Sequence, residues 1–389
     1  MKPNFLAGNR ITLLETGADY FPALIAAIGA AQTEIHLESY IYAGDGTGQA
    51  VTTALVQAAR RGVDVHVMVD GFGAPDFLAS FGYTLIAGGV QVMIYRPEVA
   101  RLRLRRHRLR RLHRKLAVVD ARLAFVGGIN IVDDIDTPGV TKPRFDYAVA
   151  IEGPLLEPIH RASHHLWRLV RWANFRRRLP YPPLVDGASE PIGELEAAFV
   201  VRDNLRHRRD IEEAYLDAIE GAREEVVIAN AYFLPGRRFR HALMDAAARG
   251  VRVSVLLQGR IEYVLQYFAT QALYGSLIAG GISIFEYRAS FLHAKVAVID
   301  GQWATVGSSN IDPFSLLLAR EANVIVRNRG FAAGLRESLG RAMREGAVEI
   351  RADDLRKRSW LARTASWLAY ATVRLAVGIA GYHGPEYRG

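Results

Sequence analysis

An internal duplication limits the folds open to this chain more than any other feature of its 389 residues. HRKLAVVDARLAFVGGIN begins at His113 and HAKVAVIDGQWATVGSSN begins at His293, and the two segments match along their whole length without a gap. Upstream, AGGVQVMIYR resembles AGGISIFEYR, and HLESYIY around Tyr40 aligns with IANAYFLP around Tyr232. Self-similarity on this scale marks a repeated architecture. We therefore predict two related lobes.

Apolar, β-rich runs alternate with helical patterns in each half. In the first half we expect strands over residues 34–41, 63–69 and 90–95, a helix ending at Ala59 and another helix over residues 75–87. Such alternation predicts an α/β sandwich with a largely parallel sheet in each lobe.

The boundary between the lobes is predicted from composition. Residues 179–189, LPYPPLVDGAS, are rich in proline and small side chains, as linkers commonly are. We therefore place one lobe at residues 1–180, the second at 190–352, and a C-terminal tail at 353–389.

The charge balance favours a polyanionic partner. The formal net charge is +9, which suits nucleic acid or an anionic membrane surface. The chain has no cysteine, which excludes disulfides, thiol catalysis and cysteine metal sites. Residues 1–17 lack the apolar run of a signal peptide, and no stretch before residue 360 approaches the length of a membrane span. We therefore expect a protein that stays in the cytoplasm.

The first half carries an arginine-rich insertion. The stretch from Tyr95 to His113 is much longer than the equivalent stretch from Tyr287 to His293. The additional residues fall in or beside RLRLRRHRLRRLHR, residues 101–114, which contains eight arginines. This tract is predicted to meet an anionic partner, and the alternative is a solvated basic loop.

Both copies contain the same spaced set of polar residues and glycines. Its members are His113, Lys115, Asp120, Gly127, Gly128 and Asn130 in the first copy, and His293, Lys295, Asp300, Gly307, Ser308 and Asn310 in the second. Alternate side chains of a strand share a face, so the histidine and lysine of each copy are expected to point the same way. Two such matches at equivalent places are not an accident of composition.

A phosphodiester substrate explains this inventory. Its anionic oxygens are bound by lysine ammonium groups and amide donors, which also stabilise charge in the transition state. Cleavage without a metal needs a nucleophile and a proton donor, and histidine can serve as either near neutral pH.

The doubled His-x-Lys-x4-Asp pattern resembles the defining motif of the phospholipase D superfamily, over about residues 9–344. Within the superfamily, NAYFLP and GSSNIDPFSL look like bacterial cardiolipin synthases, and the opening GNRITLLETGADYFPALIAAI looks most like their B type. Phe314 and Ala319 depart from the usual pattern of those synthases, and Gly128 stands where the second copy has Ser308.

The resemblance implies two lobes about a pseudo-twofold axis, with one site between them. It implies that His113 attacks phosphorus to give a phosphohistidine and that His293 protonates the leaving alcohol, although the spacing itself does not decide that order. An acceptor alcohol then takes the phosphatidyl group, and no cofactor or metal is implied.

The resemblance also assigns supporting roles. Asp146 and Glu321 match carboxylates that, some thirty residues downstream of each histidine, orient its ring; the alternative is a surface salt bridge. Asn130 and Asn310 would bind the substrate phosphate. Asp120 and Asp300 belong to the catalytic motif, but both end their strands and are expected to shape turns.

The function implied is cardiolipin synthesis from two molecules of phosphatidylglycerol, with phosphatidylethanolamine as an alternative co-substrate. The rivals are a phospholipid hydrolase, which would use water as acceptor, and a nuclease of the same superfamily. The implied partner is an anionic phospholipid membrane on the cytoplasmic side, bound peripherally, and no nucleic acid is expected.

Two segments combine basic and aromatic residues at helical spacing. In residues 360–382, Arg363 and Arg374 share one face, which predicts an interfacial helix; the alternative is a helix packed on the protein's own core. Residues 160–178 could likewise face lipid or pack. His164 and His165 are adjacent, which suits chelation on a helix poorly, so no metal is predicted.

Overall fold

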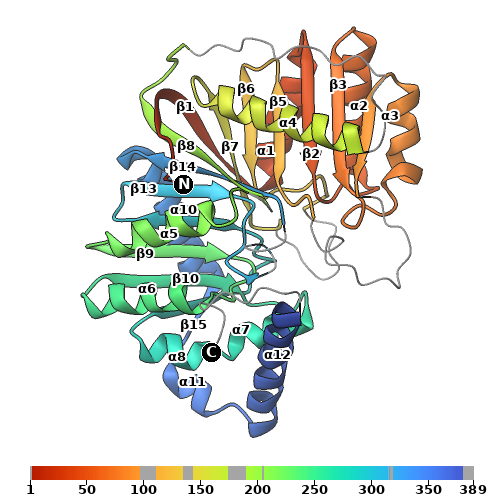
Figure 1. Ribbon diagram of the computed structural model, residues 1–389. Coiled ribbons are helices and arrows are strands. Elements are labelled where there is room, and N and C mark those ends of the chain that lie inside the picture. Colours follow the sequence, from red (N-terminus) through yellow and green to blue (C-terminus); the bar gives the residue numbers. More distant parts are fainter. Residues whose placement is uncertain are drawn as a thin grey trace.

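A fifteen-stranded β-sheet runs through both halves of the computed structural model (Figure 1). The structure describes residues 2–96, 111–134, 143–173, 190–203, 206–313, 315 and 319–379. The first lobe contains β1 (Leu6–Glu15), α1 (Thr16–Ala30), β2 (Glu34–Ser39), α2 (Gly46–Arg60), β3 (Asp64–Asp70), the π-helical turn η1 (Leu78–Gly82), α3 (Tyr83–Ala87), β4 (Gln91–Tyr95), β5 (Lys115–Val119), β6 (Leu123–Gly127), β7 (Tyr147–Glu152) and α4 (Leu156–Ala173).

The second lobe repeats this succession of elements and adds β15 at the edge of its sheet. It contains β8 (Leu195–Arg202), α5 (Asp210–Glu220), β9 (Glu225–Asn230), α6 (Arg237–Ala248), β10 (Arg252–Gln258), α7 (Val264–Gln271), α8 (Tyr274–Ala279), β11 (Ser283–Tyr287), β12 (Lys295–Ile299), β13 (Trp303–Gly307), β14 (Glu321–Arg327), α10 (Arg329–Gly346) and β15 (Ala347–Ile350). The helices α11 (Ala352–Arg356) and α12 (Trp360–Ile379) follow it.

The strand order confirms the two-lobe prediction. From the outer edge inward, the first lobe is ordered β4-β3-β2-β5-β6-β7-β1 and the second β11-β10-β9-β12-β13-β14-β8, with β15 added at the second edge. Each strand thus has a counterpart at the same place in the other lobe. The pseudo-twofold axis passes between β1 and β8, which pair antiparallel and join the two halves into one sheet.

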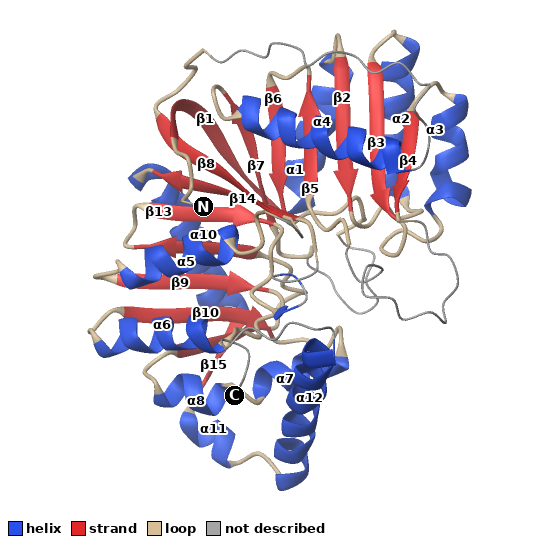
Figure 2. Ribbon diagram, viewed as in Figure 1, coloured by secondary structure: helices blue, strands red, loops and turns tan. Residues whose placement is uncertain are grey.

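The prediction of a largely parallel sheet in each half is wrong. Among the strands that the structure describes, β2-β3-β4 and β9-β10-β11 pair in parallel, and the remaining strand pairs in each lobe are antiparallel (Figure 2). The reason is local: β5 and β6, like β12 and β13, are joined by tight turns, and consecutive strands joined in this way pair antiparallel. The alternation seen in the sequence holds only for the outer three strands of each lobe.

Strand β2 shows how alternation divides the first lobe into layers. Ile35 and Leu37 point into the apolar core beneath α1 and α2. Glu34, His36 and Glu38 lie on the opposite face, which α4 covers (Figure 1). Each of these three polar side chains is almost fully buried, so this face needs polar partners from α4 and its surroundings.

A shared core lies where the lobes meet. One apolar cluster contains side chains from both halves, among them Val126 and Ile151 of the first lobe and Val298 and Leu335 of the second. Hydrophobic burial and the β1–β8 ladder therefore hold the lobes in one arrangement. The proposed linker, residues 179–189, and the arginines at 101–110 lie outside the described residues, and we keep the division at 1–180, 190–352 and 353–389 as a proposal.

Helix α12 packs on the second lobe by a narrow face. Ser366, Ala369 and Val373 are buried, and Ala369 and Val373 join the core of that lobe. The rest of the helix exposes large apolar side chains: Trp360, Leu361, Trp367, Leu368 and Leu375. Among the described residues, no helix combines the length and apolarity needed to cross a bilayer.

Candidate active site

Two short backbone bridges bring the catalytic motifs of the lobes together. Leu112 pairs with Arg320, and Phe145 pairs with Leu292. The first bridge brings His113 beside Glu321. The second brings Asp146 beside His293. Each histidine of one lobe therefore meets a carboxylate of the other.

His113 is paired with Glu321 across this interface. Its Nδ1 lies 3.0 Å from one carboxylate oxygen and 3.1 Å from the other. Because a carboxylate only accepts hydrogen bonds, Nδ1 carries the proton and Nε2 is left for a substrate. Lys115 donates to the carbonyl oxygen of His113 at 2.7 Å, and the ring of Tyr40 lies 4.7 Å from the imidazole.

His293 is paired with Asp146 in the same manner. Its Nδ1 lies 2.6 Å from Asp146 Oδ2. The Lys295 ammonium lies 2.7 Å from that nitrogen and 3.5 Å from the carboxylate, so the three groups form one buried polar cluster.

The crossed pairing corrects an expectation from the sequence. The sequence pairs Asp146 and Glu321 with the histidines that precede them in the same lobe, but each orients the histidine of the opposite lobe. Sequence distance cannot show this crossing because it arises from contacts between lobes. Neither carboxylate forms a surface salt bridge, since Glu321 is fully buried and Asp146 nearly so.

Both histidines line one cavity of about 360 Å³ between the lobes. Asn130, Asn310, Arg144 and Tyr232 also line it. The first lobe contributes one histidine and one asparagine and the second lobe contributes the equivalent pair, so the sequence-predicted residues converge on a single space. Lys115 and Lys295 lie buried directly behind the histidines.

The electrostatics of the cavity disfavour the protonated form of both imidazoles. Burial lowers the pKa of His113, with Glu321 opposing that effect. Burial together with the Lys295 charge lowers the pKa of His293 further below its ordinary value. Burial lowers the pKa of Lys115 to about 7 and that of Lys295 to about 8, and it raises the pKa of Asp146. A bound phosphate anion would reverse these shifts for the cationic groups.

The two asparagines differ in their hydrogen bonds. Asn130 Oδ1 accepts from the backbone N–H of Ile41 at 3.0 Å, which fixes the amide toward the cavity. The side-chain oxygen of Asn310 is buried without a hydrogen-bond partner among the described residues. An amide oxygen only accepts hydrogen bonds, so this atom is suited to a hydroxyl of a substrate and not to an anionic oxygen.

Asp120 and Asp300 lie at the far ends of their strands and do not line the cavity. Asp120 accepts hydrogen bonds from the backbone N–H groups of Gln32, Thr33 and Glu34. Asp300 accepts from three N–H groups at the equivalent turn of the second lobe. Both aspartates adopt positive φ, 52° and 49°. The structure thus places both aspartates in turns, as their position at the strand ends suggests, and their role in the catalytic motif stays a prediction.

The difference between Gly128 and Ser308 has a steric explanation. A Cβ on Gly128 would lie 2.3 Å from Asp146 Oδ1, so any side chain there would displace the carboxylate. In the second copy Ser308 donates a hydrogen bond to Glu321 at 2.5 Å. The two carboxylates are therefore held in different ways, one by lack of space and one by a hydroxyl.

Several cavity residues are not singled out as site residues by the sequence. Arg144 of the first lobe pairs with Glu262 of the second at 3.0 Å, and Tyr232 donates to the same carboxylate at 2.8 Å. Tyr40 and Tyr232 occupy matching places in the duplication, a signal that is present in the sequence. The Arg144–Glu262 pair has no matching signal because the duplication does not repeat it.

Two α/β lobes that share one site built from paired His-x-Lys motifs define a phospholipase D-type enzyme. The family model described as "Cardiolipin synthase, PLD-like domain" matches the chain twice, over residues 24–152 and 215–343, once in each lobe. The chain belongs to this family of enzymes. The resemblance inferred from the motifs is thereby confirmed.

Individual relatives agree with this placement. Cardiolipin synthase B of Escherichia coli (strain K12) is 41% identical over 382 residues, which cover 98% of this chain and 92% of that one. Cardiolipin synthase A of Pectobacterium atrosepticum is 30% identical over 337 residues, covering 84% of this chain and 68% of that one. The crystal structure of phosphatidylserine synthase from Haemophilus influenzae Rd KW20 shares the fold, with a TM-score of 0.70 at 15% identity, covering 97% of this chain and 96% of that one.

Proposed function

We propose that the protein transfers a phosphatidyl group between two molecules of phosphatidylglycerol, giving cardiolipin and glycerol. The observation that supports this most directly is the pair of crossed histidine–carboxylate contacts, which leaves the Nε2 atom of each ring available at one cavity. A two-step exchange at one phosphorus needs one such nitrogen to attack and one to carry the proton.

In the proposed first step, His113 Nε2 attacks phosphorus and the bond to the headgroup glycerol breaks. His293, which must be protonated at Nε2 as well as Nδ1 when the anionic substrate is bound, gives the Nε2 proton to the departing alkoxide, so that free glycerol leaves and a phosphohistidine remains. In the second step His293 takes the proton of an acceptor hydroxyl, the new ester bond forms, and the N–P bond breaks. Phosphodiester replaces phosphodiester, so no nucleotide is required.

The cationic and amide groups around the rings would stabilise the extra charge at phosphorus. Lys115 and Lys295 stand behind the histidines, and Asn130 and Asn310 face the cavity. Preorganised donors in a site shielded from water act most strongly on charge that develops in the transition state.

The order of the two histidines rests on the resemblance to the superfamily. Rapid quenching with phosphatidylglycerol labelled at phosphorus, followed by peptide mapping, identifies which ring carries the phosphate. Label on the peptide containing His113 supports the proposed order, and label on the His293 peptide reverses it.

We further propose that the protein works on the cytoplasmic face of an anionic membrane, which it binds peripherally. Tyr263, at the start of α7, lines the cavity, and Val264 and Leu265 next to it are exposed. Helix α12 packs against α7 and exposes Trp360 and Trp367 among other apolar side chains. Aromatic side chains at a surface with a net positive protein charge suit the headgroup layer.

The test is a product analysis. Vesicles of phosphatidylglycerol with an isotope-labelled headgroup are incubated with the purified protein, with and without phosphatidylethanolamine, and lipids and water-soluble products are measured by mass spectrometry. Cardiolipin and labelled glycerol in equal amounts support the transferase. Phosphatidic acid without cardiolipin would instead identify the hydrolase, and ethanolamine release that accompanies cardiolipin would identify phosphatidylethanolamine as co-substrate.

A further inference from the structure

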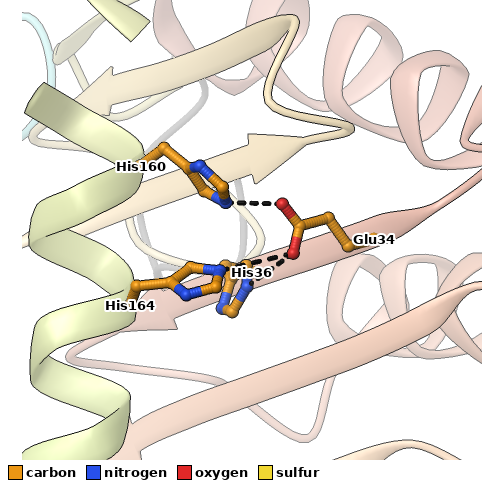
Figure 3. Close-up of side chains that lie close together, drawn as sticks. All are labelled: Glu34, His36, His160 and His164. Atoms are coloured by element: carbon orange, nitrogen blue, oxygen red, sulfur yellow. Dashed lines mark hydrogen bonds and ion pairs between the residues drawn. The ribbon is translucent and has the colours of Figure 1, made fainter. Parts of the chain in front are cut away.

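A second group of titratable side chains lies inside the first lobe, away from the catalytic cavity (Figure 3). Glu34 and His36 come from β2, and His160 and His164 come from α4. All four are between 1% and 3% exposed. Their candidate ligand atoms lie within 4.8 Å of one another. None of the four lines the cavity that contains His113 and His293.

The distances suit one shared cation. His36 Nε2 and His164 Nε2 lie 3.3 Å and 3.4 Å from Glu34 Oε2. Ligand atoms around a tetrahedral zinc ion, each about 2.0–2.1 Å from it, are separated by about 3.3 Å. His160 Nε2 lies closer, 2.5 Å from Glu34 Oε1. A cation between them would need the His160 ring to move outward, and the remaining candidate ligand atoms already lie within 4.8 Å of one another.

The contact between His160 and Glu34 is poorly explained by hydrogen bonding. Neither His160 Nε2 nor Glu34 Oε1 has a hydrogen-bond partner among the described residues, although the two atoms are in contact and fully buried. Figure 3 shows the imidazole nitrogen directed at the carboxylate oxygen. A cation bound between this nitrogen and the carboxylate oxygen would give both buried atoms a partner.

The charges point the same way. The cluster consists of one buried carboxylate and three buried imidazoles, and it contains no lysine or arginine. A divalent ion would neutralise it and use the lone pair of every ring. Three histidines with one carboxylate, and no cysteine, form a donor set typical of zinc and neighbouring first-row ions.

The second lobe shows what this interface contains when no such cluster is built. The alignment that places Asp146 opposite Glu321 also places His160 opposite Leu335 and His164 opposite Leu339. These two leucines are fully buried in an apolar core.

The strands differ in the same manner. The equivalent ends of β2 and β9 place His36 opposite Val227, which is also buried. Glu225, the counterpart of Glu34, forms an ion pair with Arg336 at 3.0 Å. The first lobe therefore has three imidazoles around its carboxylate where the second lobe has three apolar side chains, and Arg161, opposite Arg336, pairs with Glu157 instead.

We propose that Glu34, His36, His160 and His164 bind one divalent transition-metal ion, with zinc the best fit, and that the ion joins β2 to α4. All four protein ligands are buried, which is typical of a structural metal site rather than a catalytic one. His160 and His164 are four residues apart and share a helix face, whereas His165 is exposed. The sequence-based argument against a metal considers the adjacent pair and so misses the pair that shares a face.

The experiment uses the full-length chain without a histidine tag, purified without chelators. Metal content is measured by inductively coupled plasma mass spectrometry, and the metal-free protein is titrated with ZnCl2 and, separately, CoCl2. We expect about one ion per chain, a Co²⁺ absorption spectrum of a four-coordinate site, and a melting temperature that rises when Zn²⁺ is restored. A metal-free protein that takes up neither ion in a saturable manner overturns the proposal.

Variants copied from the second lobe locate the ion. His160→Leu combined with His164→Leu introduces the residues found at the equivalent positions, and should weaken Zn²⁺ binding at least about 100-fold. His165→Ala on the same helix is the matched control and should bind as the unchanged protein does. Equal loss in both variants, or none in the double variant, contradicts the site. If the double variant fails to fold, the Co²⁺ spectrum of the unchanged protein decides the question.

Discussion

His113 and Glu321 lie 208 positions apart in the chain, yet the imidazole Nδ1 is 3.0 Å from the carboxylate. The contact joins opposite lobes, and its counterpart joins His293 to Asp146. The catalytic groups are therefore built as two interlobe units. Removal of a carboxylate should affect the step that belongs to the histidine of the other lobe.

Glu321→Gln and Asp146→Asn are each expected to lower kcat on the order of 100-fold, because the ring loses its fixed tautomer. A substrate with an acidic leaving group, phosphatidyl-p-nitrophenol, needs no proton donor in the first step. If His113 is the nucleophile, this substrate should restore p-nitrophenol release in Asp146→Asn but not in Glu321→Gln. Rescue of Glu321→Gln instead would reverse the roles, and equal rescue of both would contradict the crossed units.

Glu15→Gln provides the control for these carboxylates. Glu15 of β1 also contacts the other lobe, through Arg341 at 3.3 Å, but both side chains are partly exposed and lie outside the catalytic cavity. We expect kcat within about twofold of the unchanged protein, since exposed ion pairs contribute little.

His113→Ala and His293→Ala should each abolish cardiolipin formation in phosphatidylglycerol vesicles. Neither ring has a substitute in the cavity at the same position, and nucleophile and proton donor act as one unit. Product is measured by mass spectrometry, with circular dichroism to verify folding. Full activity in either variant would contradict the two-histidine mechanism.

Gly128→Ser should be far more harmful than Ser308→Ala. The added side chain at position 128 would meet the Asp146 carboxylate at 2.3 Å, whereas Ser308→Ala only removes one hydrogen bond to Glu321. We expect losses in kcat of about 100-fold and about 10-fold respectively. Similar losses in the two variants, measured by steady-state kinetics on vesicles, would contradict the steric account.

The KM for phosphatidylglycerol should rise with pH. The pKa is about 7 for Lys115 and about 8 for Lys295, so both side chains carry a positive charge below pH 7. That charge is lost from Lys115 as pH rises through 7 and from Lys295 as it rises through 8. The anionic phosphodiester then loses its electrostatic partners, and we expect KM to increase about tenfold between pH 6.5 and 9. Vesicle kinetics across that range provide the measurement, and a flat KM would contradict the titration.

Asp120→Ala and Asp300→Ala should reduce stability and leave chemistry intact. Each carboxylate accepts three backbone hydrogen bonds at a turn outside the cavity. We expect the free energy of unfolding to fall by about 2 kcal/mol in each variant, measured by urea denaturation. The kcat of the folded protein should change less than about threefold, and a large loss of kcat at unchanged stability would return these residues to the catalytic set.

The two-lobe architecture was predictable because the sequence contains an internal duplication. The paired motifs implied two lobes, and their gap-free alignment places β5 and β6 opposite β12 and β13. The antiparallel pairing of β5 with β6 follows from the tight turn between them, whereas β7 pairs with β1 through residues more than a hundred positions apart, which alternation does not predict. Local patterns describe a strand and not its neighbour.

The site shows the same division between local and long-range information. His113, Lys115, His293 and Lys295 follow from spacing alone, and the turn role of Asp120 follows from its place at a strand end. The crossed carboxylates, the Arg144–Glu262 pair and the histidine cluster under α4 all depend on which faces meet. These contacts are decided by how helices and strands pack against one another, and that packing cannot be inferred from a single sequence.

The ladder between β1 and β8 also restricts how substrates can arrive. A hinge motion that separated the two lobes would have to break the pairing of β1 with β8 and expose the apolar core that both lobes share. We therefore expect the width of the cavity between the lobes to change little when a ligand binds. In the proposed reaction, both lipids would then have to reach the histidines through a cavity of fixed shape, and the released alcohol would have to leave through it.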